Sequence, residues 1–286
     1  MDGLIRNCRN FSSTYEAKNY VDIGCLNLKT ISITYWIRAN LDIEPQICKS
    51  MLGRHMNTLI KPQDLRDIDH WVFDLDNTLY PVSANLFDQI DKKMCAYIAD
   101  YLGLSHAEAY RVQKRYFREH GTSLRGMMDN HGMDPGPYLD DVHDIDLSAL
   151  KKDTQMNAVL HQLPGQKVVF TNAATNYALN VLEQLGIRHH FSGVFDIADA
   201  GFIPKPEPSP YDLVIRRFGI DPKSAVMVED IARNLRPASD RGMKTVWVKT
   251  DRPWAHAEAE TVTPDFTTTN LSAWLAEVVG LAPVAH

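Results

Sequence analysis

The chain has 286 residues, of which 44% are hydrophobic and 23% charged, and its formal net charge is −6 at pH 7. This length can bury a sizeable core in one large domain or two smaller ones, and the composition is that of an ordinary globular protein. The negative balance argues against a nucleic-acid partner, because nucleic-acid binders present a clustered basic face. No run approaches the roughly 18 consecutive apolar residues of a membrane-spanning helix, so no membrane partner is expected.

Residues 1–65 differ in composition from the rest of the sequence. Three of the four cysteines lie in this segment, and no two cysteines have the C-x-x-C spacing of a zinc or redox site. The first residues lack the apolar core of a signal peptide, so we expect a cytoplasmic protein. We expect residues 1–65 to be an N-terminal extension, either disordered or produced by a start codon assigned too far upstream, with Met51 and Met56 as alternative starts.

From residue 66 onward, predicted strands and helices alternate. Short apolar runs predict strands at residues 71–74, 167–171, 194–197, 225–229 and 245–248. Apolar spacing and capping signals predict helices at residues 106–120, 175–185, 210–218 (with Ser209 as the N-cap) and 231–241. This alternation predicts the α/β class, with a Rossmann-like parallel sheet covered by helices on both faces.

A long helical stretch, at about residues 85–163, interrupts this alternation. Within it Leu86, Ile90 and Met94 recur at helical spacing, and a capping box at residues 105–108 opens a second helix. We therefore expect a helical domain inserted between the first and second strands. The expected division is a cap at residues 83–154 and an α/β core formed by residues 66–82 together with residues 155–286.

Two carboxylates, Asp74 and Asp76, lie at the end of the first predicted strand. Side chains alternate along a strand, so two residues spaced by two start on the same face. Such a pair can form an oxygen site for Mg²⁺, or can serve as a nucleophile with a general acid/base. Taken alone, the pair also fits an ordinary turn or helix cap.

Polar residues follow three further predicted segments. Thr171 and Asn172 end the second strand and open a loop before a helix, where phosphate binds readily. Lys205 is flanked by prolines that stiffen its backbone, and its ammonium can neutralise phosphate. Glu229 and Asp230 end the fourth strand. Each block has a plain reading as a helix cap or a surface residue, but ligands bind at the carboxyl ends of parallel strands, and the four blocks together favour a functional site.

The order Asp-x-Asp-Asn-Thr-Leu, strand-Thr-Asn, Pro-Lys-Pro and Glu-Asp resembles the haloacid dehalogenase superfamily of phosphohydrolases, over residues 66–286. Within it, residues 74–81, 121–126 and 228–235 resemble the pyrimidine 5′-nucleotidase group, particularly its bacterial members. The position of the helical insert resembles the small cap called type C1. The sequence departs from the commonest pattern at Ile231, where a Ser often follows the acidic pair.

The resemblance implies a role for each residue of the carboxylate set. Asp74 would be the nucleophile that forms an aspartyl-phosphate, and Asp76 would move protons to the leaving group and from water. Mg²⁺ would be held by the Asp74 side chain, the Asp76 backbone carbonyl and the Asp230 side chain, with Glu229 acting through a bound water. Asn234 is a candidate for orienting the Asp230 loop, although an ordinary helix position is an equal alternative.

The resemblance also implies which residues bind the substrate. Thr171, the backbone at Asn172 and Lys205 would hold the phosphoryl oxygens, and Arg125 in the cap is the leading candidate for a nucleotide contact. We expect a Mg²⁺-dependent phosphomonoesterase, specifically a pyrimidine 5′-nucleotidase acting on nucleoside monophosphates. The alternatives are a broad-specificity or other small-molecule phosphatase, or a catalytically silent protein that keeps the fold. The sequence does not fix the oligomeric state.

Overall fold

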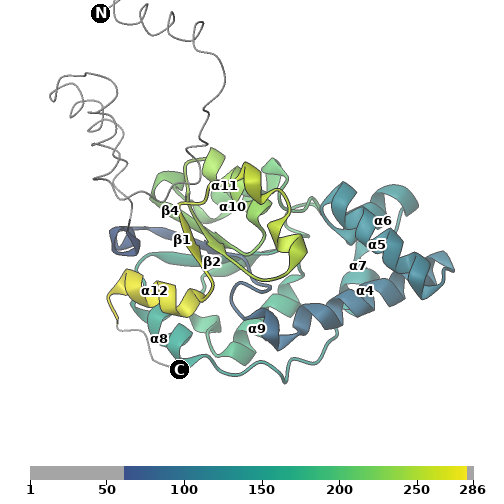
Figure 1. Cartoon of the computed structure of the whole chain (residues 1–286), viewed down its shortest axis with the longest axis horizontal. Coiled ribbons are helices and arrows are strands. Elements are labelled where there is room, and N and C mark those ends of the chain that lie inside the picture. Colours follow the sequence, from purple (N-terminus) through teal and green to yellow (C-terminus); the bar gives the residue numbers. More distant parts are fainter. Residues whose placement is uncertain (1–60, 282–286) are drawn as a thin grey trace, which may run out of the picture. The chain divides into compact units, whose positions relative to one another are not determined.

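A computed structural model describes residues 61–281, so most of the expected extension at residues 1–65 lies outside the described part of the chain. Six strands form one parallel sheet in the order β3-β2-β1-β4-β5-β6 (Figure 1). The strands are β1 (His70–Phe73), β2 (Gln166–Phe170), β3 (Gly193–Phe195), β4 (Ala225–Glu229), β5 (Lys244–Val248) and β6 (Phe266–Thr268).

The first strand lies inside the sheet, between β2 and β4. Val72 pairs in register with Val168 on one side and with Met227 on the other. The chain adds β2 and β3 on one side of β1 and then crosses over to add β4, β5 and β6 on the other side. The point where the direction reverses, between β1 and β4, is where open α/β sheets form a ligand-binding crevice at the carboxyl ends of the strands.

Helices cover both faces of the sheet, which confirms the predicted α/β fold (Figure 1). Alternate residues of β1 point to opposite faces: Phe73 packs in a cluster with Leu275 of α12, whereas Val72 packs in a separate cluster with Tyr211 of α10. Helices α8, α9 and α12 contribute to the first cluster, and α10 and α11 to the second. Their bounds are α8 (Thr154–Gln162), α9 (Thr175–Leu185), α10 (Pro208–Phe218), α11 (Arg236–Asp240) and α12 (Leu271–Val279).

Four helices between β1 and β2 form a helical insert, grouped to one side of the sheet in Figure 1. They are α4 (Leu86–Leu102), α5 (His106–His120), α6 (Ser123–His131) and α7 (Pro135–Val142). The predicted capping box opens α5: the Glu108 amide donates to the Ser105 hydroxyl, and the Glu108 carboxylate accepts from the Ser105 amide at 3.0 Å. The next helix, α8, packs against α12 of the α/β part instead.

Two predicted helices differ in the structure. Helix α10 begins at Pro208 with Glu207 as its N-cap, so the prediction of Ser209 as the cap was wrong. Proline fits the first helical position because its missing N–H is not needed there, and Pro208 already occupies it. The expected helix at 231–241 is divided into a 3₁₀ helix at Ala232–Leu235 and the short α11, because Pro237 cannot donate the hydrogen bond that a continuous helix requires.

No helix among residues 61–281 is long and apolar enough to cross a membrane.

Candidate active site

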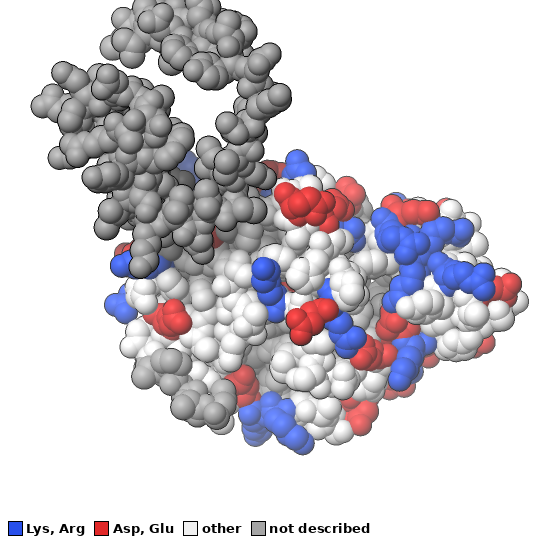
Figure 2. Space-filling view, in the orientation of Figure 1, with Lys and Arg blue, Asp and Glu red and all other residues white. Residues whose placement is uncertain are grey.

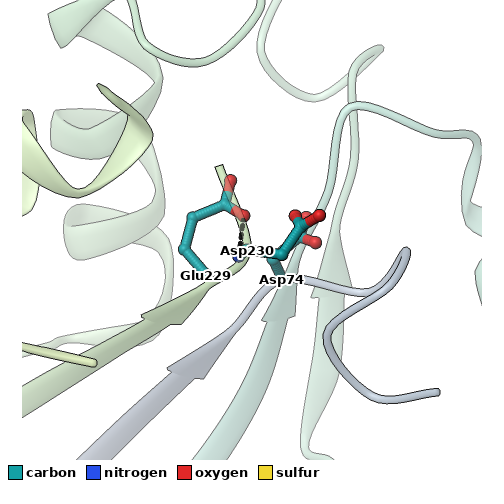
Figure 3. Close-up of side chains that lie close together, drawn as sticks. All are labelled: Asp74, Glu229 and Asp230. Carbon is teal, nitrogen blue, oxygen red and sulfur yellow. Dashed lines mark hydrogen bonds between the residues drawn. The ribbon is translucent and has the colours of Figure 1, made fainter. Parts of the chain in front are cut away.

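Three buried carboxylates converge where β1 and β4 end side by side. Asp74 follows β1, Glu229 is the last residue of β4, and Asp230 follows it. One oxygen from each lies within 4.8 Å of the other two (Figure 3). The Asp74 amide donates to the carbonyl of Val228 at 2.9 Å, which continues the β1–β4 pairing up to the carboxylates. The adjacency of the two strands therefore creates the cluster.

Lys205 is buried against this cluster. Its Nζ donates to Asp74 Oδ1 at 2.6 Å, to Glu229 Oε1 at 3.1 Å and to the carbonyl of Phe170 at 2.9 Å. Burial alone would lower the pKa of Lys205, but the negative charges of Asp74 and Glu229 hold this pKa above its ordinary value. The ammonium therefore stays charged and offsets part of the repulsion between the two carboxylates.

The Glu229 carboxylate is fully used by donors from the protein. Oε1 accepts from Lys205 and from the Asn234 side chain, while Oε2 accepts from the Asp230 amide at 2.7 Å and the Ile231 amide at 3.3 Å. The carbonyl of Asn234 in turn accepts from the Tyr211 hydroxyl at 2.6 Å. Glu229 thus orders the turn that carries Asp230, and direct metal binding by Glu229 would compete with these bonds.

Asp230 has an oxygen free to bind a ligand. Its Oδ2 is buried and has no hydrogen-bond partner within residues 61–281, whereas its backbone carbonyl accepts from the Trp247 indole at 2.8 Å. Burial and the charge of Glu229 raise the pKa of Asp230 well above its ordinary value. Burial and the same charge raise the pKa of Asp74 to about 7. A buried oxygen without a partner, beside a second carboxylate of raised pKa, fits a hard divalent cation, which would favour the ionised form of both groups.

Asp76 is held by two tyrosines that the sequence analysis did not identify. Its Oδ1 accepts from the Tyr80 hydroxyl at 2.6 Å and from the Tyr177 hydroxyl at 2.9 Å, and the His143 ring stacks on the Tyr177 ring with 4.7 Å between centroids. Burial raises the pKa of Asp76, while both hydroxyl donors lower it. Tyr80 could have been suspected, because it lies in the same motif as Asp76, but no sequence signal relates Tyr177 to it.

Thr171 and Asn172 follow β2 and line the same cavity as Asp74. The Thr171 Oγ1 accepts from the Ala173 amide at 3.0 Å, which shapes the turn after the strand. The Asn172 side chain accepts from the Lys205 amide at 2.9 Å. The sequence predicted a role for the Asn172 backbone, and the structure adds that its side chain fixes the segment carrying Lys205.

A cavity of about 470 Å³ opens above these residues and is bounded on its other side by the helical insert. Asp74, Asp76, Thr171, Asn172, Lys205, Glu229 and Asp230, all predicted site residues, line it. The insert and the segment after β5 contribute aromatic walls, including Phe87 and Trp254, whose ring centroids are 5.4 Å apart. A small molecule bound here would contact the carboxylates at one end and the insert at the other.

Arg125 does not line this cavity. Its guanidinium bonds Asp129 one turn later on α6, with Nη2 to Oδ1 at 2.9 Å and Nε to Oδ2 at 3.0 Å. The residues just before it, Thr122, Ser123 and Leu124, do line the cavity. The motif at residues 121–126 therefore reaches the cavity, but through neighbours of Arg125, and substrate binding by Arg125 itself stays a prediction.

Lys and Arg side chains gather on the helical insert (Figure 2). Helix α5 carries Arg111, Lys114, Arg115 and Arg118, and Lys114 lines the cavity. A positive surface raises the local concentration of anions and speeds their encounter with a nearby cleft. Residues 86–142 taken together nevertheless contain more Asp and Glu than Lys and Arg, and Lys114 and Arg115 are paired with carboxylates, so any such effect is local to this patch.

Comparison with known proteins identifies relatives of this chain. The family description "haloacid dehalogenase-like hydrolase" matches residues 68–240. Phosphate metabolism protein 8 of Saccharomyces cerevisiae is 28% identical over 213 residues, which cover 67% of this chain and 66% of that protein. Phosphoglycolate phosphatase of Chromobacterium violaceum is 31% identical over 113 residues, covering 39% of this chain and 47% of that protein. The chain thus spans less than two thirds of the length of these curated relatives.

Among solved structures, the haloacid dehalogenase-type (HAD) phosphatase from Thermococcus onnurineus aligns with a TM-score of 0.50 at 20% sequence identity. The alignment covers 76% of this chain and 100% of that one. At this level of identity the likeness concerns the fold alone.

Proposed function

We propose that this chain, which belongs to the haloacid dehalogenase-like hydrolase family, is a phosphomonoesterase that works through an aspartyl-phosphate. The proposed substrates are nucleoside monophosphates, as for a pyrimidine 5′-nucleotidase. One observation carries the proposal: Asp74 is bound by Lys205 and lies beside the free oxygen of Asp230 at the end of a substrate-sized cavity. The relatives whose names describe phosphatases support the reaction type.

The proposed cofactor is Mg²⁺. It would be held by the side chains of Asp74 and Asp230 and the backbone carbonyl of Asp76, with Glu229 acting through a bound water. When bound, Mg²⁺ supplies positive charge that neutralises the phosphoryl group and keeps the carboxylates ionised. The free Asp230 oxygen supports this assignment, because a buried carboxylate oxygen without a donor is otherwise costly.

Each residue of the site has a separate role in the proposed reaction. Asp74 attacks phosphorus, and Lys205 and Thr171 bind the phosphoryl oxygens on which charge accumulates. Lys205 would exchange one of its three acceptors in the protein for a phosphoryl oxygen. Asp76, positioned by its two tyrosine donors, protonates the departing alkoxide and then takes a proton from the water that releases phosphate. In this proposal residues 66–82 and 155–286 form the catalytic core, and residues 83–154 form the cap that excludes water.

A panel of phosphate esters tests the proposed function. The protein would be assayed with UMP, CMP, AMP, sugar phosphates and p-nitrophenyl phosphate, each with Mg²⁺ and with a chelator. We expect hydrolysis only with Mg²⁺ and the highest kcat/KM for UMP or CMP. A preference for sugar phosphates would contradict the nucleotidase assignment and favour another phosphatase. Absence of any hydrolysis would favour a catalytically silent protein.

Substituting Tyr177 by Phe removes one of the two donors to Asp76. We expect kcat for UMP to fall about tenfold, the equivalent of one hydrogen bond to a charged group, with little change in KM. Because a donor to a carboxylate lowers its pKa, the step in the pH–rate profile that belongs to Asp76 should move to higher pH.

Tyr116→Phe is the matched control, because the Tyr116 hydroxyl bonds His131 Nε2 at 2.8 Å inside the insert and Tyr116 does not line the cavity. It should leave kcat and the pH profile unchanged. Equal behaviour of the two variants would contradict a positioning role for Tyr177.

The effect of Mg²⁺ on stability should depend on pH. The raised pKa of Asp74, about 7, means that the folded protein without metal holds a proton that the unfolded chain releases near pH 4, so its stability falls as pH rises from about 4 to about 7. Mg²⁺ requires the ionised form and should stabilise mainly above this range. At 100 times its Kd the ion adds about 2.7 kcal/mol, or roughly 5–10 °C in Tm.

Calorimetry with Mg²⁺ or EDTA should therefore show the full rise in Tm at pH 8 and little at pH 5. Asp230→Asn should remove most of the rise at pH 8. A rise in Tm that is the same at both values would argue against metal binding by these carboxylates.

A further inference from the structure

The wall of the cavity formed by the insert contains a buried amide whose oxygen has no partner. The side chain of Gln113 on α5 is buried, and its Nε2 donates to Asp91 Oδ1 at 2.8 Å and to the Asp91 carbonyl at 3.1 Å. Both of these partners are acceptors, so the orientation of the amide is fixed. The other end, Oε1, is buried and has no hydrogen-bond partner within residues 61–281.

The protein holds this amide in place before any ligand binds. Lys114 Nζ bonds Asp91 Oδ1 at 2.6 Å, which fixes the acceptor that orients Gln113. The Ser123 hydroxyl donates to the backbone carbonyl of Gln113 at 3.2 Å, and this bond joins the start of α6 to α5. Gln113, Asp91, Lys114 and Ser123 all line the cavity that contains Asp74. Gln113 therefore lies in the wall of the cavity, and its Oε1 is an acceptor whose orientation is fixed in advance.

A second unpartnered polar atom lies in the same wall. The side chain of Tyr138 on α7 is buried, and its hydroxyl has no hydrogen-bond partner among the described residues. Burial raises the pKa of Tyr138, so the hydroxyl keeps its proton and can donate. Buried polar groups in native proteins are almost always paired, and an unpaired one in a ligand-sized cavity indicates a ligand that pairs it. Within residues 61–281, Gln113 Oε1 and the Tyr138 hydroxyl are two of five such atoms on residues that line this cavity; the others are His143 Nδ1, Asp230 Oδ2 and Arg233 Nε.

The rest of the wall is suited to a flat ring. Phe87 and Trp254 form an aromatic pair, and Ile90 and Leu124 add apolar surface. Ligand sites commonly combine apolar and aromatic walls with a few fixed polar groups that set orientation. An acceptor and a hydroxyl on such a wall complement a planar ring whose edge has a donor beside an acceptor.

We infer that Gln113 Oε1 and the Tyr138 hydroxyl select the leaving group by hydrogen-bonding the edge of a pyrimidine base that has a donor beside an acceptor. The inference rests on the proposed function and assigns the specificity of that site. In uracil the N3–H donates to Gln113 Oε1 and an adjacent carbonyl accepts from Tyr138. In cytosine the exocyclic amine donates and N3 accepts. A leaving group without an N–H donor leaves Gln113 Oε1 unpaired and should be hydrolysed with a lower kcat/KM.

Three substrates and one substitution test this inference. UMP carries the N3–H donor, N3-methyl-UMP has a methyl group in its place, and phenyl phosphate has a ring without N–H. For the wild-type protein we expect kcat/KM to be roughly 10- to 100-fold higher for UMP than for N3-methyl-UMP, the ratio for one lost hydrogen bond that leaves a buried acceptor unpaired.

Gln113→Met keeps the length of the side chain but removes both the Oε1 acceptor and the Nε2 donor to Asp91, and in this variant the ratio should fall to about one. Activity toward phenyl phosphate should stay within about twofold of wild type, which also shows that the variant is folded. Gln184→Met is the matched control: Gln184 bonds the carbonyl of Leu150 at 3.3 Å, does not line the cavity, and should keep the wild-type ratio. Tyr138→Phe should lower kcat/KM for UMP while sparing phenyl phosphate.

The possible failures are distinguishable. Equal wild-type activity on UMP and N3-methyl-UMP overturns the inference without any variant, and leaves the proposed phosphatase reaction standing. A ratio that persists in Gln113→Met assigns the discrimination to other residues and also overturns it. Loss of phenyl phosphate hydrolysis in the wild type, together with loss of UMP hydrolysis, overturns the proposed function itself.

Discussion

Asp74→Asn is expected to lower kcat for phosphate ester hydrolysis by at least about 10³-fold, with a much smaller change in KM. An amide is not a competent nucleophile here, and it is a poorer ligand for a divalent cation than a carboxylate. The fold should be retained, because burial raises the pKa of Asp74 to about 7, and a neutral amide of similar size avoids the cost of burying a charge. Steady-state kinetics would measure the loss, and acid-quenched protein should no longer retain label from a phosphate-labelled substrate.

Asp76→Asn is the comparison that separates the two carboxylates. It should slow expulsion of a nucleoside strongly but that of p-nitrophenolate only weakly, because a good leaving group needs no proton in the transition state. The covalent label should still form on Asp74 with p-nitrophenyl phosphate. Near-wild-type activity of Asp74→Asn with any substrate would rule out the aspartyl-phosphate mechanism.

Lys205→Met is expected to have the largest effect on stability. It leaves the carboxylates of Asp74 and Glu229 buried without their cation, and breaking a buried pair in this way costs about 3–5 kcal/mol. Loss of the cation raises the folded-state pKa of Asp74 further, so protonation at low pH relieves more of the repulsion. Urea unfolding in EDTA should therefore show a larger loss at pH 8 than at pH 5.

Lys167→Met provides a matched control at another buried lysine. The Lys167 ammonium donates to the carbonyl of Gly165 at 3.0 Å, and no carboxylate of residues 61–281 lies within salt-bridge distance. Its replacement should change the free energy of unfolding by less than about 1 kcal/mol. Because burial and, to a smaller extent, the Lys167 charge lower the pKa of His190, some pH dependence is expected between pH 5 and 8, but it should be small beside that of Lys205→Met. Equal, pH-independent losses in both variants would mean that the ion pairs of Lys205 contribute little.

The sequence predicted the elements whose signals are local. Helix α9 has the predicted bounds, Thr175 to Leu185, because apolar spacing and a glycine at the following position both lie within the segment. The convergence of Asp74 with Asp230 was also predictable, since the rule that ligands bind at the carboxyl ends of parallel strands does not require the register of the strands.

Other features depend on contacts that a linear pattern does not contain. Strand β6 has only three residues and is defined by pairing with β5, so residues 266–268 gave no strand signal. Tyr177 and Gln113 are ordinary helix residues until the fold brings Tyr177 to Asp76 and places Gln113 in the wall of the cavity. Arg125 was predicted from its motif, but only the structure defines that its side chain pairs with Asp129.

The stack between His143 and Tyr177 joins the end of the insert to a residue that donates to Asp76. His143 lies directly after α7, where the chain leaves the insert, while Tyr177 belongs to α9 beneath the sheet. Burial lowers the pKa of His143 to about 4, so its ring stays neutral and the stack does not switch with pH near neutrality. If the insert swings outward, His143 leaves Tyr177 and water reaches the hydroxyl that binds Asp76. In the proposed reaction, the donor to Asp76 would then be shielded from water only while the insert lies over the cavity.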